Sequence, residues 1–129
     1  MRFDDDPFSV VDGEAKEESL ARRMRGYEKR FFSNVVPIDR LQVASLDGPA
    51  KLLCIDKERV LQINAALAAY PHLCGVLILH ELINNKLLLE GKALLSGRPL
   101  YETDKPAYEE LVQIEVDRLW REGAYNGLL

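Results

Sequence analysis

Cysteine, histidine and long apolar runs are scarce in this sequence. Among its 129 residues are two cysteines and two histidines. The cysteines, Cys54 and Cys74, are too far apart to form a CxxC redox or zinc motif. Each lies in an apolar segment, where a free cysteine usually behaves as a small core residue. We therefore expect both to be buried.

Membrane and nucleic-acid partners are not indicated either. The longest apolar stretch, residues 73–79, is much shorter than the roughly 20 residues that a membrane-spanning helix needs. The formal net charge of −4 gives no general attraction to phosphate backbones or anionic membranes. Acids occupy residues 4–6, where a signal peptide would carry a basic region, so we expect a cytoplasmic protein.

The composition is that of one compact domain, with 47% hydrophobic and 29% charged residues. Residues 1–13 combine several acids with Pro7 and Gly13, which predicts a flexible N-terminal arm. Residues 14–129 are then left as a single domain with one hydrophobic core.

Hydrophobic periodicity predicts three helices and a small antiparallel meander of about three strands, an α+β fold. The first helix covers residues 14 to about 32. A second, residues 71–89, is apolar nearly all round and is expected in the core, with Gly91 as its C-cap. The last runs from residue 105 to about 122. The strands are predicted at residues 41–46, 50–55 and 60–63.

The first predicted helix carries a cluster of basic residues. Its members are Arg22, Arg23, Arg25, Lys29 and Arg30. Such a cluster serves as a binding patch in some proteins, but the solvated face of a helix is its commoner origin. We interpret it as a solvated face.

The buried helix contains polar residues inside an apolar run. Residues 76–84 read VLILHELIN. His80 and Asn84, four residues apart, share one helix face, whereas Glu81 projects about 100° to the side. In the complete HExxH motif two histidines hold zinc and the glutamate activates a water for attack on a peptide carbonyl. Because burying polar groups without partners costs roughly 1 to 3 kcal/mol each, these residues call for an explanation.

On these residues the sequence resembles the SprT-like zincins, a family of zinc metallopeptidases. Their meander ends in an I-x-[IL]-[SN] strand, which a short spacer joins to a buried LLHExIH helix. Here residues 61–64 read LQIN and residues 65–73 form the spacer. The resemblance covers residues 38–125. It implies a zincin-like α+β domain with His80 as a metal ligand, Glu81 as the catalytic base and a polypeptide substrate.

The sequence departs from this family at two of its three ligand positions. Asn84 stands at the second, and no histidine follows His80. The family's third ligand lies in an H-G-x-x-F segment, whose nearest counterpart begins at Asp104. Asparagine is a poor zinc ligand because its amide oxygen is neutral and hard, so a zinc site of His80, Asn84 and Asp104 would be weak. Glu109 or Glu110 would be alternative carboxylates, since the ImmA/IrrE zincins use an acidic third ligand.

Three interpretations follow. The first is a metallopeptidase-related protein with a degenerate metal site, inactive or weakly active, that would hold zinc poorly. The second is a non-catalytic peptide-binding or regulatory module that captures an extended polypeptide by strand addition at the edge of the meander. The third is a small α+β domain in which the HELI sequence is coincidental. His80 and Glu81 would then belong to a core polar network with Asn84, Asn85 or the backbone, without a metal.

Overall fold

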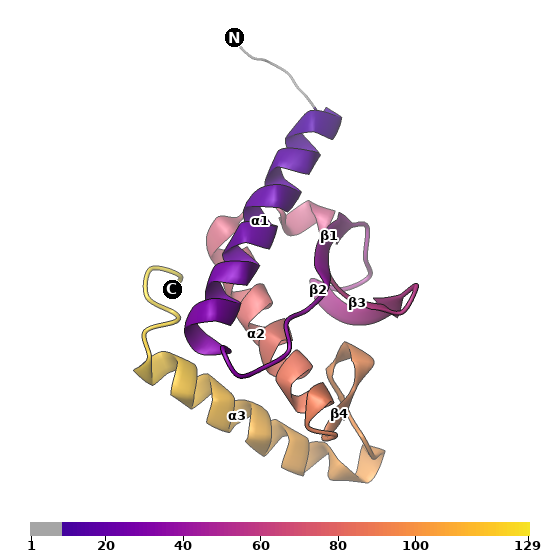
Figure 1. The fold of residues 1–129 in the computed structure, drawn as a ribbon, viewed down its shortest axis with the longest axis vertical. Helices are drawn as coiled ribbons and strands as arrows, with labels where there is room; N and C mark the ends of the chain where they lie inside the picture. The colour runs from indigo at the N-terminus through magenta and orange to yellow at the C-terminus, as the bar shows by residue number, and fades with distance from the viewer. Residues whose placement is uncertain (1–8) are drawn as a thin grey trace.

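Within residues 9–129, the fold consists of three α-helices, a three-stranded sheet and a two-stranded ribbon (Figure 1). This computed structural model describes the backbone of those residues and the side chains from residue 16 onward. The helices are α1 (Ser9–Phe31), α2 (Pro71–Leu89) and α3 (Lys105–Arg121). The α+β class predicted from the sequence is therefore confirmed. In the described part of the chain, no helix combines the length and apolar character that a membrane span requires.

The three-stranded sheet is mixed, and its central strand is the last in sequence. Its strands are β1 (Arg40–Ala44), β2 (Ala50–Ile55) and β3 (Glu58–Asn64), in the order β1-β3-β2. β2 and β3 form the antiparallel hairpin that the sequence predicts. β1 instead runs parallel to β3, with Leu41 opposite Leu61. The prediction of a wholly antiparallel meander is therefore wrong.

The sequence of β3 explains its central position. Val60 and Leu61 are both fully buried, and neighbouring residues of a strand face opposite sides of a sheet, so β3 is covered on both faces. Asn64 then fixes the connection between β1 and β2. Its side-chain amide donates to the carbonyls of Leu46 and Gly48 at 3.1 and 2.9 Å, which holds this loop at the end of β3.

The helix α2 begins and ends at the residues predicted from the sequence. Pro71 occupies its first turn, where the missing N–H of proline costs no hydrogen bond. Gly91, with φ of 72°, follows its end. The N–H groups of Gly91 and Lys92 donate to the carbonyls of Leu88 and Leu87 at 3.0 and 2.9 Å, the pattern of a Schellman C-cap. The predicted C-cap is therefore confirmed.

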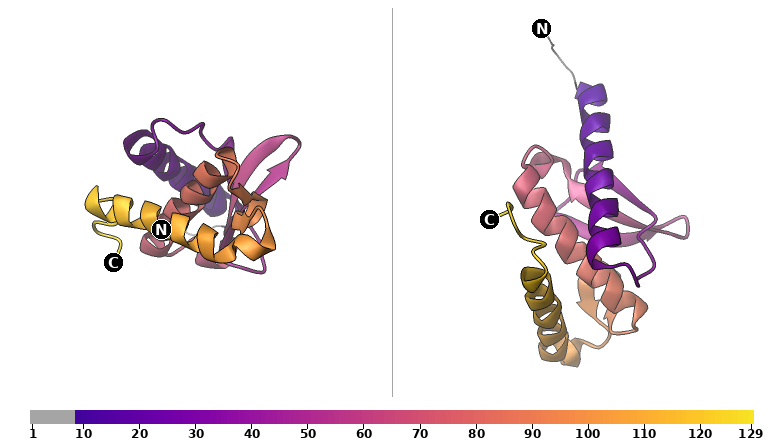
Figure 2. Two further views of the ribbon diagram at one scale, coloured as in Figure 1. Left: turned by 90° about the horizontal axis from the view of Figure 1, so that it is seen from below. Right: turned by 60° about the vertical axis from the view of Figure 1, so that its left-hand side comes forward.

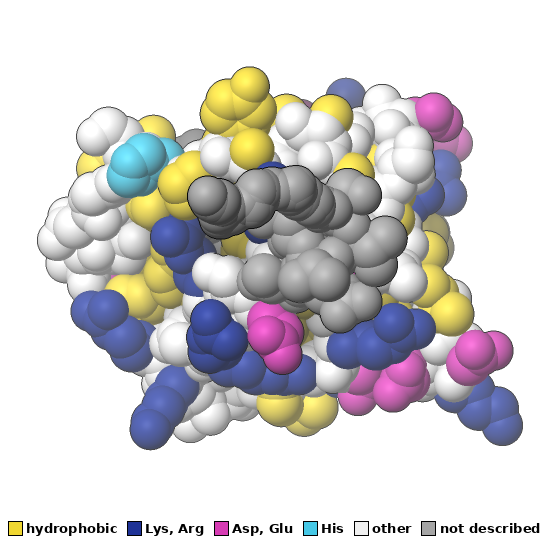
Figure 3. Space-filling model, turned by 90° about the horizontal axis from the view of Figure 1, so that it is seen from above, with side chains coloured by type: hydrophobic (Ala, Val, Ile, Leu, Met, Phe, Trp, Pro, Cys, Tyr) yellow, Lys and Arg dark blue, Asp and Glu magenta, His cyan; other side chains and the backbone are white. Residues whose placement is uncertain are grey.

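The helix α1 begins at Ser9 rather than at Glu14, so it includes the last residues of the predicted N-terminal arm. Residues 1–8 of that arm lie outside the described residues. Leu20, Met24 and Phe31 are buried at helical spacing, which packs one face of α1 against the core. Seen from above, Lys and Arg side chains gather on the left of the molecule, whereas acidic and basic side chains intermingle on the right (Figure 3).

The helix α3 crosses beneath the C-terminal ends of α1 and α2 (Figure 1). Arg118 Nη1 donates to the carbonyl of Phe31 at 2.9 Å, which ties α3 to the end of α1. Lys86 Nζ lies 2.6 Å from Glu115 Oε2, which ties α3 to the last turns of α2. Both contacts lie in the second half of α3 and fix how this helix crosses the ends of α1 and α2.

The two cysteines differ in exposure. Cys74 is buried, as predicted, and its Sγ lies 3.2 Å from the carbonyl of Leu67. Cys54 is exposed, so the prediction of a buried residue is wrong. It lies near the tip of the β2–β3 hairpin, which extends away from the helices (Figure 2). An apolar segment of the sequence therefore reaches beyond the part of the sheet that the helices cover.

Candidate functional site

The polar residues of the HELIN segment, residues 80–84, have different surroundings along α2. His80 is exposed. Glu81 and Asn84 are 6% and 3% exposed. His80 and Asn84 share a helix face, but Asn84 lies one turn further along, where another segment of the chain covers it. The helical spacing alone does not reveal this difference.

Glu81, Asn84 and Tyr108 form a hydrogen-bonded chain between two helices. Asn84 Nδ2 donates to Glu81 Oε1 at 3.1 Å. The hydroxyl of Tyr108, on α3, donates to Asn84 Oδ1. Both ends of the Asn84 amide are therefore satisfied by protein groups, as buried polar atoms usually are. We refer to these three side chains as the Asn84 chain.

Burial sets the electrostatics of the Asn84 chain. It raises the pKa of Glu81 above its ordinary value of 4.5, and the hydrogen bond from Asn84 and the charge of His80 lower that pKa in part. Burial, followed by the charge of Glu81, raises the pKa of Tyr108 to about 12. Tyr108 therefore stays protonated near neutral pH, and its hydroxyl remains a donor to Asn84.

A short segment after α2 covers the Asn84 chain. The ribbon consists of β4 (Ala93–Leu94) and β5 (Arg98–Pro99), joined by the 3₁₀ turn η2 (Leu95–Gly97). η2 contacts both α2 and β2, and the Ser96 hydroxyl makes a long hydrogen bond of 3.4 Å to the carbonyl of Leu52 on β2. η2 therefore bridges the sheet and the helix directly above Asn84.

Gly97 makes this close cover feasible. Its φ is 69°, and an added Cβ would lie 2.8 Å from Asn84 Cγ. Any other residue would meet both backbone strain and a clash at this position. The sequence pattern by itself assigns no role to Gly97 or Tyr108. A glycine in a predicted loop signals a turn, but it does not identify the distant residue against which the turn packs.

The predicted metal ligands are not brought together. Asp104 is exposed and lines a pocket of about 230 Å³ that also includes Gly91, at the C-terminal end of α2. At the helical rise of about 1.5 Å per residue, His80 lies about 14 Å along the axis of α2 from its last residue, Leu89. Asn84 Oδ1 already accepts from Tyr108. The alternatives Glu109 and Glu110 are exposed on α3.

This donor set does not fit a zincin metal centre. Such a centre needs three converging protein ligands of the imidazole, carboxylate or thiolate type. In the part of the chain that the structure describes, no three His, Cys, Asp or Glu side chains are placed to hold one ion. His80 has only a neutral amide at the neighbouring ligand position, and that amide is engaged elsewhere.

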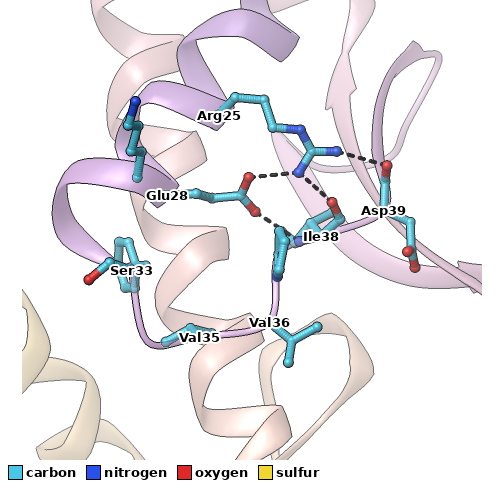
Figure 4. Close-up of a pocket in the computed structure, with 10 residues that line it drawn as sticks. Arg25, Glu28, Ser33, Val35, Val36, Ile38 and Asp39 are labelled. Carbon is cyan, nitrogen blue, oxygen red and sulfur yellow. Dashed lines mark hydrogen bonds and ion pairs between the residues drawn. The ribbon is translucent and has the colours of Figure 1, made fainter.

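A second hollow, of about 590 Å³, lies between the end of α1 and residues 33–39 (Figure 4). Its charged walls are used to hold this loop. Glu28 Oε2 accepts the N–H of Ile38 at 2.8 Å, and Arg25 donates to Glu28 Oε1 and to the carbonyls of Ile38 and Asp39 at 2.7, 2.6 and 2.9 Å. Because these groups already satisfy one another, we assign the hollow a structural role.

Fold and site together define a small α+β domain with a polar chain buried beneath a short ribbon. Comparisons with protein-family models, with curated protein sequences and with solved structures found no match. The relation to the SprT-like zincins rests on the sequence motif and stays a prediction.

Proposed function

We propose that this protein is a zincin-related domain with a degenerate metal site that does not cleave peptides. The proposal rests on one observation, the hydrogen bonds of the Asn84 side-chain amide. It stands at the second ligand position of the motif, and its amide joins Glu81 to Tyr108. A zincin helix needs a free metal ligand there, whereas this chain uses the position to connect α2 to α3.

The position of Glu81 also supports a non-catalytic role. A raised pKa alone would suit a general base, but a base must also reach the water or substrate from which it takes a proton. Glu81 is almost fully buried, and its carboxylate accepts a hydrogen bond from Asn84. Because only 6% of Glu81 is exposed, this carboxylate is poorly placed to meet a substrate carbonyl or its attacking water.

Zinc binding by the native chain and by Asn84→His tests the proposal. Each protein is loaded with zinc, dialysed and measured by elemental analysis. The double variant His80→Ala/Asn84→His is the control. We expect little zinc on the native chain and a gain on Asn84→His that requires His80, because two imidazoles one helical turn apart can hold one ion.

Two results would count against the proposal. Stoichiometric zinc on the native chain, together with peptide cleavage that Glu81→Gln abolishes, would establish a working peptidase. If neither protein bound zinc, the zincin relation would lose its support and the HELI sequence would be coincidental. Circular dichroism of each variant would show whether the substitutions preserve the fold.

A second candidate function is polypeptide binding beside the edge strand β2. The ribbon next to this strand and the two residues that follow it expose Leu94, Leu100 and Tyr101, which flank a hollow of about 600 Å³. Exposed apolar side chains around a hollow are typical of a surface that binds a partner.

Extended peptides selected by phage display should bind the native chain and lose affinity on Leu100→Ser. Val36→Ser, at another exposed aliphatic residue, is the control, and an equal loss in both variants would exclude this site.

A further inference from the structure

A cationic pocket lies between α1, the start of α2 and the turns that follow α3. It has a volume of about 510 Å³. Its polar side chains include Arg23, Tyr27, Arg30 and His72. At the helical rise of about 1.5 Å per residue, His72 lies about 18 Å from Asn84 along the axis of α2. The pocket is therefore separate from the Asn84 chain, and the function proposed above makes no use of it.

Among residues 16–129, no acidic side chain neutralises the positive charge of this pocket. None of its lining residues is acidic. Within residues 16–129, Arg23 and Arg30 make no ion pair with a carboxylate, whereas the nearby Arg25 pairs with Glu28. Figure 3 likewise shows one side of the molecule where basic side chains have few acidic neighbours. In a chain of net charge −4, two arginines that line one pocket without an ion pair to residues 16–129 favour an anionic ligand.

Packing restrains both guanidinium groups. Arg23 Nη1 donates to the carbonyl of Pro71 at the start of α2. The guanidinium carbon of Arg30 lies 4.9 Å from the centre of the Phe31 ring, a cation–π distance. Side chains that are already restrained lose less conformational entropy when a ligand binds. The pocket therefore offers partly preorganised donors.

Tyr27 adds a hydroxyl to the same wall. Burial raises the pKa of Tyr27, and the charges of Arg23 and Arg30 lower it. Arg23 Nη1 and Tyr27 Oη also approach the same point of α2. Gly75 of α2 allows this approach, because an added Cβ would lie 3.0 Å from both Arg23 Nη1 and Tyr27 Oη. The glycine that interrupts the apolar run of α2 thus brings α1 and its donors against this helix.

We propose that this pocket binds the phosphate group of a small phosphomonoester, through Arg23, Arg30, Tyr27 and His72. Two guanidinium groups, a hydroxyl and an imidazole provide more donors than the two oxygens of a carboxylate require. A phosphate presents three acceptor oxygens and close to two negative charges, and guanidinium groups bind it with two parallel hydrogen bonds. Because the hollow is larger than inorganic phosphate alone, it leaves room for an organic group.

The test is a titration of the full chain with inorganic phosphate. NMR spectra recorded at each phosphate concentration give the amide chemical shifts that report binding. Sodium chloride at matched ionic strength corrects for general screening, and acetate is the carboxylate probe. Saturable phosphate shifts should map to the walls of the pocket. Arg30→Gln should weaken phosphate binding about tenfold, as expected for the loss of one charge-assisted contact.

Arg22→Gln is the matched control. Arg22 is an exposed arginine on the same helix that does not line the pocket, so its removal changes the net charge equally and should leave phosphate affinity within about twofold. An equal loss in both variants, or no saturation beyond the salt control, would overturn the proposal. Acetate binding as tight as phosphate binding would also overturn it, in favour of a carboxylate ligand.

Discussion

Asn84 connects two helices through a single amide group. Replacing it by alanine leaves the Glu81 carboxyl and the Tyr108 hydroxyl without their partner in a buried site. Each buried polar group left unpaired costs roughly 1 to 3 kcal/mol. We expect Asn84→Ala to lower the free energy of unfolding by roughly 2 to 4 kcal/mol, measured by urea denaturation. The exposed Asn34→Ala should change it by less than about 0.5 kcal/mol, and similar effects in both variants would contradict the buried chain.

The raised pKa of Glu81 predicts a pH dependence of stability. The folded protein keeps the proton of Glu81 at pH values where the unfolded chain has released it. The unfolded chain then binds fewer protons, so the free energy of unfolding falls as the pH rises from about 4.5 through the higher pKa of the folded state. Glu81→Gln keeps an acceptor for Asn84 but does not titrate.

We therefore expect Glu81→Gln to become progressively more stable than the native chain as the pH is raised. Urea denaturation of both proteins at several pH values from about 4 to about 8 measures this difference. All other titrating groups are shared, so they largely cancel. A difference that stays constant with pH would mean that the Glu81 carboxyl is not held in a buried environment.

The sequence alone predicts only the part of this site that lies on one helix. Glu81 and Asn84 are three residues apart on α2, so their contact follows from helical geometry. Tyr108 and Gly97 come from other elements, and their contacts with Asn84 depend on how those elements pack. Their residue types carry no signal for this packing. The alternative of a core polar network includes the Glu81–Asn84 hydrogen bond, but His80 is exposed and lies outside that contact.

At the scale of elements, the end of α2 depends on the backbone conformation of Gly91. Its φ of 72° is unfavourable for a residue with a Cβ, by roughly 1 to 2 kcal/mol. Gly91→Ala should therefore lower the free energy of unfolding by about 1 kcal/mol. Gly26, inside α1, has no atom within 4 Å of an added Cβ, so Gly26→Ala should raise stability by roughly 0.5 to 1 kcal/mol. Thermal and urea denaturation would measure both variants, and effects of the same sign would contradict this assignment.

The elements differ in how well the sequence predicts them. The first and last residues of α2 follow from local chemistry, because Pro71 and Gly91 each determine the backbone conformation at one end of the helix. The order of the strands does not, because it depends on long-range contacts such as those of Asn64 with the loop after β1. An alternating apolar pattern identifies a strand but not its neighbour. The antiparallel prediction therefore holds for the β2–β3 hairpin and fails for β1.

At the scale of the whole molecule, both α1 and α2 hold the loop of residues 33–39. Arg25 and Glu28 bind its backbone from α1 (Figure 4). From α2, Asn85 Nδ2 donates to the carbonyl of Val36 at 3.0 Å, and Asn85 Oδ1 accepts from Arg59 of β3. This loop leads directly into β1. The two helices and the sheet are thus joined through one segment, which favours cooperative unfolding.

Cooperative unfolding predicts a large difference in reactivity between the two thiols. Cys54 is exposed, whereas Cys74 is fully buried on α2 and burial raises its pKa, which disfavours the reactive thiolate. We expect one thiol to react promptly with Ellman's reagent in the native protein and the second only as fast as the molecule unfolds. Cys54→Ser should remove the fast phase and Cys74→Ser the slow one. If the slow phase were independent of denaturant while global unfolding accelerated, the start of α2 would open locally, without separation of the whole core.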